Sequence, residues 1–259
     1  AVFESVSAIT TTGLSTISEV DDYSPALLLL RAWMQWYGGL GIAVFSLALA
    51  LGHLAGARRL AGIYRQEDLH ASTRTYARQV LSAYLVLTVV AVLILWWSLG
   101  DGLQALLYAL AAVSTGGFSG YEQSLADMPS RLAPYLTLGA ALLGALPLIL
   151  YYQIASRRGW KPAGDPEWWA LPLTVALVGL LLVLILHVDD GMGWSDALHH
   201  GMLLGASAQT TAGFSTLTVG ELSDSAKLWL IVAMLGGGSI GSTAGGIKLL
   251  RLLILAKLV

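Results

Sequence analysis

The sequence Ser7-Ala8-Ile9-Thr10-Thr11-Thr12-Gly13-Leu14-Ser15-Thr16 decides the fold, because two variants of it follow further along the chain. The second copy is Ala111-Ala112-Val113-Ser114-Thr115-Gly116-Gly117-Phe118-Ser119, and the third is Ala206-Ser207-Ala208-Gln209-Thr210-Thr211-Ala212-Gly213-Phe214-Ser215-Thr216. In each copy, hydroxyl side chains stand two and three places before a glycine, which is followed by Leu or Phe and then Ser. The three glycines are similarly spaced, which indicates one duplicated structural unit.

The composition is that of a membrane protein. The hydrophobic fraction is 56% and the charged fraction is 12%, about half the roughly 25% of soluble domains, and the mean hydropathy is +0.70. So few charges cannot cover a soluble surface. The chain has no cysteine, which excludes disulfides and thiolate metal sites. Its net charge of -2 gives no basic field, so no nucleic-acid partner is expected.

Five apolar stretches are long enough to cross a bilayer, since a hydrocarbon core about 30 Å thick requires roughly 20 residues of helix. They run from about Pro25 to Leu54, Tyr76 to Leu99, Leu132 to Ala155, Trp168 to His187, and Ala226 to Val259, the last with a glycine interruption. The sequence therefore predicts an all-α transmembrane protein. Pro147 is expected to kink the third span.

Charges outside these spans are sorted by sign. One set of loops holds most of the basic residues: Arg58, Arg59, Arg65, Arg74, Arg78, Arg157, Arg158, Lys161, Lys248, Arg251 and Lys257. The opposite set holds Glu19, Asp21, Asp22, Asp101, Glu122, Asp127, Asp189, Asp190, Asp196, Glu221 and Asp224. The positive-inside rule places the basic set in the cytoplasm. We therefore expect a multi-pass protein of the bacterial inner membrane, with the acidic loops outside and membrane lipid around it.

Each copy of the motif follows a segment too short to span, such as Gly102–Val113 or Trp194–Ala208, and a full span follows it. The unit is therefore span, re-entrant helix, glycine turn, span. Irregular backbone persists at membrane depth only where it is buried or lines a water-filled cavity, and rings of carbonyls can replace the water shell of a potassium ion. We predict an ion filter, with K⁺ as the bound and transported metal, at Thr10, Thr11, Thr12, Gly13, Leu14, Ser114, Thr115, Gly116, Gly117, Phe118, Thr210, Thr211, Ala212, Gly213 and Phe214.

The interruption between Gly236 and Gly246 lies where a helix interior would not place six glycines, since each costs roughly 1 kcal/mol relative to alanine. It predicts a broken helix, in which Ser239, Ser242 and Thr243 satisfy the freed backbone groups. Close packing of an unbroken helix through small residues is the alternative. Two smaller features have structural interpretations. Glu4 is expected to accept a hydrogen bond from nearby backbone, and the glycines of Gly38-Gly39-Leu40-Gly41 to pack against a pore helix.

On these residues the chain resembles the pore-forming subunits of the Trk/Ktr/HKT superfamily, most closely the bacterial TrkH and KtrB proteins. The resemblance rests on Phe3 to Gly13, Gln35 to Ile42, Ser114 to Ser119 and Gly236 to Lys248. It implies repeated span–pore helix–filter–span units around a pseudo-fourfold pore. The expected repeats are 1–54, 76–158 and 168–259, so the chain is expected to lack the start of the first repeat and all of a fourth, which leaves the pore incomplete.

The resemblance also implies the working parts and partners. It assigns a gate beneath the filter to Gly236, Gly237, Gly238, Ser239, Gly241, Ser242, Thr243, Gly245, Gly246 and Lys248. Glycine in all three filters resembles the potassium-selective pattern. A homodimer on a cytoplasmic nucleotide-binding regulatory subunit is expected, and no organic cofactor.

Three other functions stay open on the sequence. An ion-coupled secondary transporter would use the broken helix as a substrate site. A non-conducting, truncated product is the second. An intramembrane enzyme is disfavoured, because no phosphate loop, nucleophile elbow or catalytic carboxylate pair is present.

Overall fold

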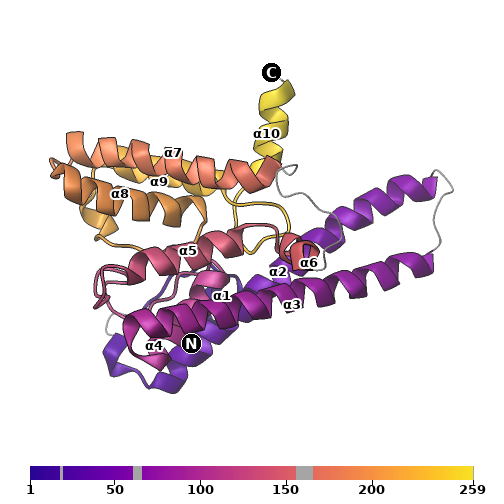
Figure 1. The fold of residues 1–259 in the computed structure, drawn as a ribbon, viewed down its shortest axis with the longest axis horizontal. Helices are drawn as coiled ribbons and strands as arrows, with labels where there is room; N and C mark the ends of the chain where they lie inside the picture. The colour runs from indigo at the N-terminus through magenta and orange to yellow at the C-terminus, as the bar shows by residue number, and fades with distance from the viewer. Residues whose placement is uncertain (18–19, 61–65, 156–165, 259) are drawn as a thin grey trace.

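The computed structural model describes residues 1–17, 20–60, 66–155 and 166–258, and within these ranges every regular element is a helix (Figure 1). The α-helices are α1 (Val2–Ile9), α2 (Pro25–Leu60), α3 (Gln66–Leu99), α4 (Gly102–Val113), α5 (Ala133–Ala145), α6 (Leu148–Ala155), α7 (Pro166–Val188), α8 (Trp194–Gln209), α9 (Asp224–Gly236) and α10 (Leu249–Leu258). The predicted all-α class is confirmed.

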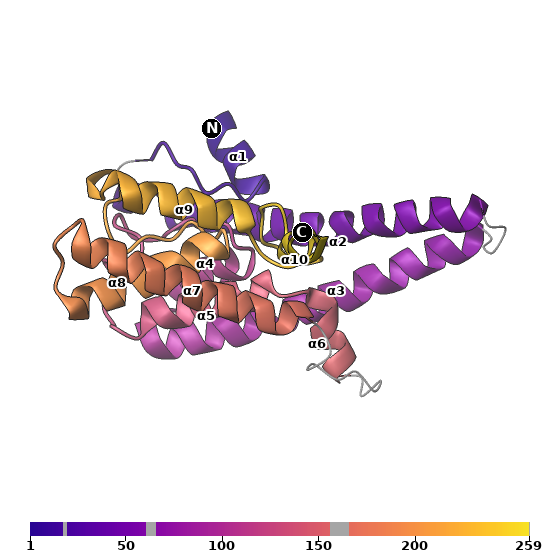
Figure 2. The same cartoon turned by 90° about the horizontal axis from the view of Figure 1, so that it is seen from above.

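Two units of the same design lie side by side. In each, the helix that precedes a copy of the motif packs against the helices on either side of it in the chain: α4 packs on α3 and α5, and α8 packs on α7 and α9. Figures 1 and 2 show α7, α8 and α9 running together as one bundle beside α5. Helix α4 also packs on α2, and α5 meets α8, so the two units share a boundary. Of the helices described with their side chains, α3 and α7 are each long and apolar enough to span a membrane.

Helix α4 is the buried centre of the first unit. Every residue from Ala105 to Val113 except Leu106 is buried, and most of these residues are alanine or leucine. Its start is fixed by Asp101, whose carboxylate accepts hydrogen bonds from the backbone N–H groups of Leu103 and Gln104. An N-cap of this kind satisfies donors that a helix leaves free. The predicted boundaries of this re-entrant helix, Gly102 to Val113, are confirmed.

The third predicted span is not one continuous helix. Helices α5 and α6 are bent by 86° relative to each other, with Leu146 and Pro147 between them. Leu146 is extended, with φ -82° and ψ 156°, as the residue before a proline prefers. The freed backbone is used elsewhere, since Leu148 N donates to Gly241 O at 3.1 Å. The expected kink at Pro147 is confirmed, and α5 and α6 together are long and apolar enough to form one broken span.

The fifth span is broken as predicted. Helix α9 ends at Gly236, Gly237 has φ +68°, and α10 begins only at Leu249, turned steeply away from α9 (Figure 1). We call residues 237–248 the glycine-rich loop. The alternative of an unbroken, closely packed helix is wrong.

Several expected loop charges lie outside the described residues. These are Glu19, Arg65, Arg157, Arg158 and Lys161, together with the side chains of Asp21, Arg58, Arg59 and Lys257.

Candidate functional site

The three motif copies fold into three turns with the same backbone, at residues 10–14, 114–118 and 210–214; we call these the glycine turns. The second hydroxyl residue of each copy has a positive φ: +54° at Thr11, +52° at Thr115 and +55° at Thr211. The glycine two places later also has a positive φ: +76°, +84° and +75°. Such values are uncommon for threonine, so three matching pairs indicate one specified turn geometry.

The same hydrogen bonds close all three turns. The first hydroxyl, on Thr10, Ser114 or Thr210, donates at 2.7 Å to the carbonyl four residues back in its helix. The next two N–H groups then bond to carbonyls three and five residues back. These contacts complete the carboxyl ends of α1, α4 and α8. The first hydroxyl of each motif therefore bonds to a carbonyl in the last turn of the preceding helix.

Neighbouring glycine turns meet at their glycines. A Cβ atom on Gly13 would lie 2.2 Å from Gly116 O, and one on Gly117 would lie 2.3 Å from Ala212 O. The first turn therefore packs on the second, and the second packs on the third, in the same manner. The structure thus brings together the predicted residues of all three copies, and glycine is required at both contacts because any side chain would strike a carbonyl.

An ion pair that the sequence did not predict supports the first turn. Glu4 Oε1 accepts from Thr16 N at 2.7 Å, and Glu4 Oε2 lies 2.9 Å from Arg31 Nη2. Arg31 also donates to Ser15 Oγ at 2.8 Å and lies over the Phe118 ring, 4.1 Å from its centroid. The expected backbone hydrogen bond of Glu4 is confirmed. Arg31 was missed, although a single arginine inside an apolar stretch is itself a signal of function or pairing.

Helix α2 approaches the turns closely. A Cβ on Gly38 would lie 2.0 Å from Ile9 O, and one on Gly39 would lie 2.8 Å from Ser114 Cβ. The predicted packing of these glycines against pore helices is confirmed for both. It is wrong for Gly41, where a Cβ would meet nothing within 4 Å. Gln35 of the same helix donates to Gly116 O at 2.7 Å.

The glycine-rich loop lies against the second and third turns. Thr243 Oγ1 is 3.0 Å from both Val113 O and Gly144 O, the first of which ends α4. Gly245 N donates to Thr211 Oγ1 at 2.7 Å. The loop therefore bonds to the end of α4 and to the glycine turn that follows α8.

Two side chains from outside the loop bond to its backbone, and one side chain of the loop itself folds back on it. Gln209 Nε2 donates to Gly237 O at 2.7 Å, and the buried Glu167 accepts from Ile240 N at 3.1 Å. Lys248, at φ +80°, turns its ammonium group onto Ala244 O. Neither Gln209 nor Glu167 was predicted to serve the loop.

The loop's hydroxyls only partly follow expectation. Ser242 Oγ donates to Ser239 O at 2.6 Å, and Thr243 bonds as described above, so both satisfy freed backbone groups. The buried hydroxyl of Ser239 has no hydrogen-bond partner within the described residues, so that part of the prediction is wrong.

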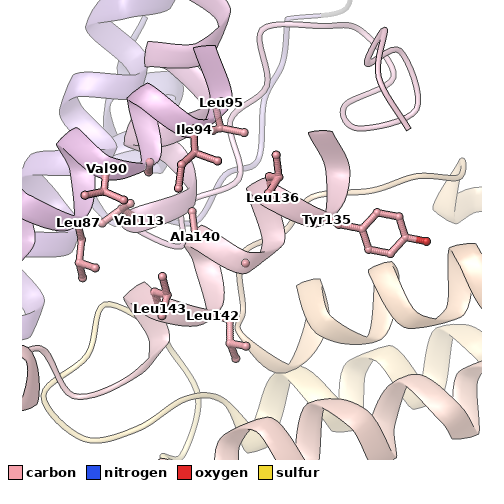
Figure 3. A pocket seen from close by; sticks show the side chains of 12 residues that line it. Leu87, Val90, Ile94, Leu95, Val113, Tyr135, Leu136, Ala140, Leu142 and Leu143 are labelled. Atoms are coloured by element: carbon pink, nitrogen blue, oxygen red, sulfur yellow. The ribbon is translucent and has the colours of Figure 1, made fainter. Parts of the chain in front are cut away.

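Two other features bear on the choice of site in the part of the chain that the structure describes. No group of three or more His, Asp or Glu residues there could hold a metal ion. A cavity of about 380 Å³ lies between α3 and α5, lined almost wholly by aliphatic side chains (Figure 3). Tyr135, its one hydroxyl-bearing side chain, directs that hydroxyl to His199 Nδ1 at 2.7 Å. This lining has no groups to coordinate a cation, so the glycine turns remain the candidate site.

Comparison with known proteins gives a consistent result. The family TrkH, described as cation transport protein, matches residues 1–164 and 167–259. The Trk system potassium uptake protein TrkH of Vibrio parahaemolyticus is 28% identical over 264 residues, covering 98% of this chain and 54% of that protein. TrkH of Escherichia coli K12 is 27% identical, covering 99% and 55%. TrkI of Halomonas elongata is 31% identical, covering 97% and 52%.

A solved structure agrees with the fold. The crystal structure of the potassium transporter TrkH from Vibrio parahaemolyticus superposes with a TM-score of 0.83 at 29% identity, covering 98% of this chain and 53% of that one. The chain spans about half the length of the relatives it matches.

Proposed function

The chain belongs to the TrkH family of cation transport proteins, and from this premise we propose that its glycine turns form part of a potassium-selective filter in a membrane pore. The observation that carries the proposal is the matched geometry of the three turns, with paired positive φ values and glycine-to-carbonyl contacts between neighbours. Backbone carbonyls near residues 10–14, 114–118 and 210–214 would replace the water shell of K⁺. Relatives named potassium uptake proteins support this choice of ion.

The chemistry of the re-entrant helices favours a cation. Helices α1, α4 and α8 each end directly at a glycine turn. The carboxyl end of a helix carries a partial negative charge of about half an elementary unit, so the helix ends add to the attraction of the carbonyls. No proton transfer or covalent step is required, and movement follows the electrochemical gradient of the ion.

We propose that the glycine-rich loop is the gate. Two contacts support this: the Thr243 hydroxyl bonded to Val113 O and the Gly245 N–H bonded to Thr211 Oγ1. Each is a single hydrogen bond, worth about 1 kcal/mol net. Because each bond of this kind is weak, a change that breaks several of them together would release the loop.

The setting proposed for this pore is a bacterial inner membrane, with the glycine turns on the outer side, and a homodimer bound to a cytoplasmic nucleotide-binding regulatory subunit. The apolar helices and the membrane transport relatives support the membrane location. Of the basic residues expected to face the regulatory subunit or anionic lipid, Arg74 and Arg78 lie exposed on α3.

The test is ion flux through the full-length protein in proteoliposomes. We expect ⁸⁶Rb⁺ uptake driven by a membrane potential alone, inhibited by external K⁺ and unaffected by equal Na⁺. Uptake that required an imposed proton or sodium gradient would favour the ion-coupled alternative. Absence of any Rb⁺ flux would refute the proposal.

A further inference from the structure

Gln35 of α2 is a fully buried carboxamide that holds the second glycine turn on both sides of its glycine. Its Nε2 donates to Gly116 O at 2.7 Å, and its Oε1 accepts from Phe118 N at 3.2 Å. These two backbone groups flank Gly117, which has φ +84°. One side chain therefore fixes the peptide groups before and after the residue whose conformation defines the turn.

The sequence of the second turn makes room for this side chain. The residue before the glycine is Thr12 in the first copy and Ala212 in the third, but Gly116 in the second. A Cβ atom at Gly116 would lie 2.6 Å from the Gln35 carboxamide carbon and 2.7 Å from its oxygen. Of the three copies, only the second has no side chain at this position, and it is the copy whose turn Gln35 contacts.

Helix α2 presents Gln35 rigidly. Trp36 Nε1 donates to Thr88 Oγ1 at 2.9 Å, and Tyr84 Oη donates to Trp36 O at 3.0 Å. Arg31, one turn earlier on the same face, is paired with Glu4 and reaches the ring of Phe118. A side chain held by such supporting contacts defines geometry better than one on a loop.

From these contacts we propose that Gln35 is a positioning residue that sets the preference of the second glycine turn for K⁺ over Na⁺. The proposal rests on the function proposed above. A smaller ion is coordinated well only if the surrounding carbonyls move inward. The two hydrogen bonds from Gln35 oppose that movement, because an inward shift of the Gly116 and Phe118 peptide groups breaks them and leaves a buried carboxamide unpaired.

The test compares variants of the full-length protein in proteoliposomes by ⁸⁶Rb⁺ and ²²Na⁺ uptake under a fixed membrane potential. Gln35→Leu removes both hydrogen bonds at similar volume. Ionised Gln35→Glu keeps an acceptor for Phe118 N but places a carboxylate oxygen, which cannot donate, against Gly116 O. We expect the Rb⁺-to-Na⁺ uptake ratio to fall at least about fivefold in both, because each loses at least one hydrogen bond worth about 1 kcal/mol net. Gly116→Ala should reproduce this fall, because its Cβ displaces the carboxamide. Gln123→Glu, the same change on an exposed outer loop, should leave the ratio unchanged.

The outcomes are separable. Wild-type flux with an unchanged ratio in both Gln35 variants would overturn the role of Gln35 and leave the proposed function standing. Loss of folded protein in both variants, judged by size-exclusion chromatography, would assign Gln35 to stability alone and would also overturn it. Absence of flux in the wild type would instead refute the proposed function.

Discussion

At the residue scale, Gly13 and Gly100 have almost the same φ, +76° and +73°, but different surroundings. A Cβ on Gly13 would lie 2.2 Å from Gly116 O, whereas one on Gly100 would meet nothing within 4 Å. Alanine at either position would carry the cost of backbone strain, roughly 1–2 kcal/mol for a residue with a Cβ in this region. Only alanine at position 13 would also collide with a neighbouring turn, so comparing the two variants distinguishes strain from collision.

We predict that Gly13→Ala reduces ⁸⁶Rb⁺ uptake at least about tenfold. The new Cβ forces the turn to move, and we expect the free-energy cost of that movement to exceed the roughly 1.4 kcal/mol that corresponds to a factor of ten. Gly100→Ala should lower the melting temperature slightly and leave uptake unchanged. Equal effects of the two substitutions on uptake would show that the contact between the first and second turns has no role.

The pair formed by Glu4 and Arg31 gives a second prediction at this scale. Glu4→Gln leaves the Arg31 guanidinium, 7% exposed, without its ionic partner, which costs about 3 kcal/mol when such a pair is well buried. We expect a lower melting temperature by tryptophan fluorescence. The double variant Glu4→Gln, Arg31→Met should recover part of the loss, since no unpaired charge remains. A double variant less stable than Glu4→Gln alone would contradict this explanation.

At the scale of elements, the glycine-rich loop is hydrogen-bonded to α4, α5, α7 and α8. Thr243→Val keeps the shape of the side chain but removes its hydrogen bonds to Val113 O and Gly144 O. If the loop is the gate, its closed position loses about 1 kcal/mol or more, and we expect Rb⁺ uptake at limiting concentration to rise roughly fivefold. Thr174→Val, which removes a hydroxyl bond within α7, is the matched control. Equal uptake in wild type and Thr243→Val would argue against gating by this loop.

Local sequence signals predicted the elements that carry the turns. The limits of α4 follow from Asp101 and from an apolar stretch too short to span, and both were visible in the sequence. At Pro147 the sequence indicated a kink but not its size, because the 86° bend also involves the bond from Leu148 N to Gly241 O in a distant segment.

The side chains that support the site were harder to find. Gln35 bonds to Gly116, 81 residues away, and Glu167 bonds to Ile240, 73 residues away. Each is a single polar residue in or beside an apolar stretch. Its partner is a backbone group, and because every residue has backbone groups, the sequence does not indicate which one is the partner. Residues of this kind become identifiable only when the helices are placed together.

At the scale of the whole molecule, three short helices from distant parts of the chain direct their carboxyl ends to adjoining glycine turns. That arrangement explains why the motif recurs, why glycine stands at each contact, and why α9 and α10 are separated. It assigns no role in conduction to the aliphatic cavity between α3 and α5.

The most direct test of the central claim is to locate the ion. Crystals of the full-length protein grown in Rb⁺ or Tl⁺ would be measured at the absorption edge of that ion. The account predicts anomalous density coordinated by backbone carbonyls of residues 10–14, 114–118 and 210–214, lost on exchange into Na⁺. Ordered Rb⁺ or Tl⁺ density elsewhere in the protein, with none at the glycine turns, would contradict it.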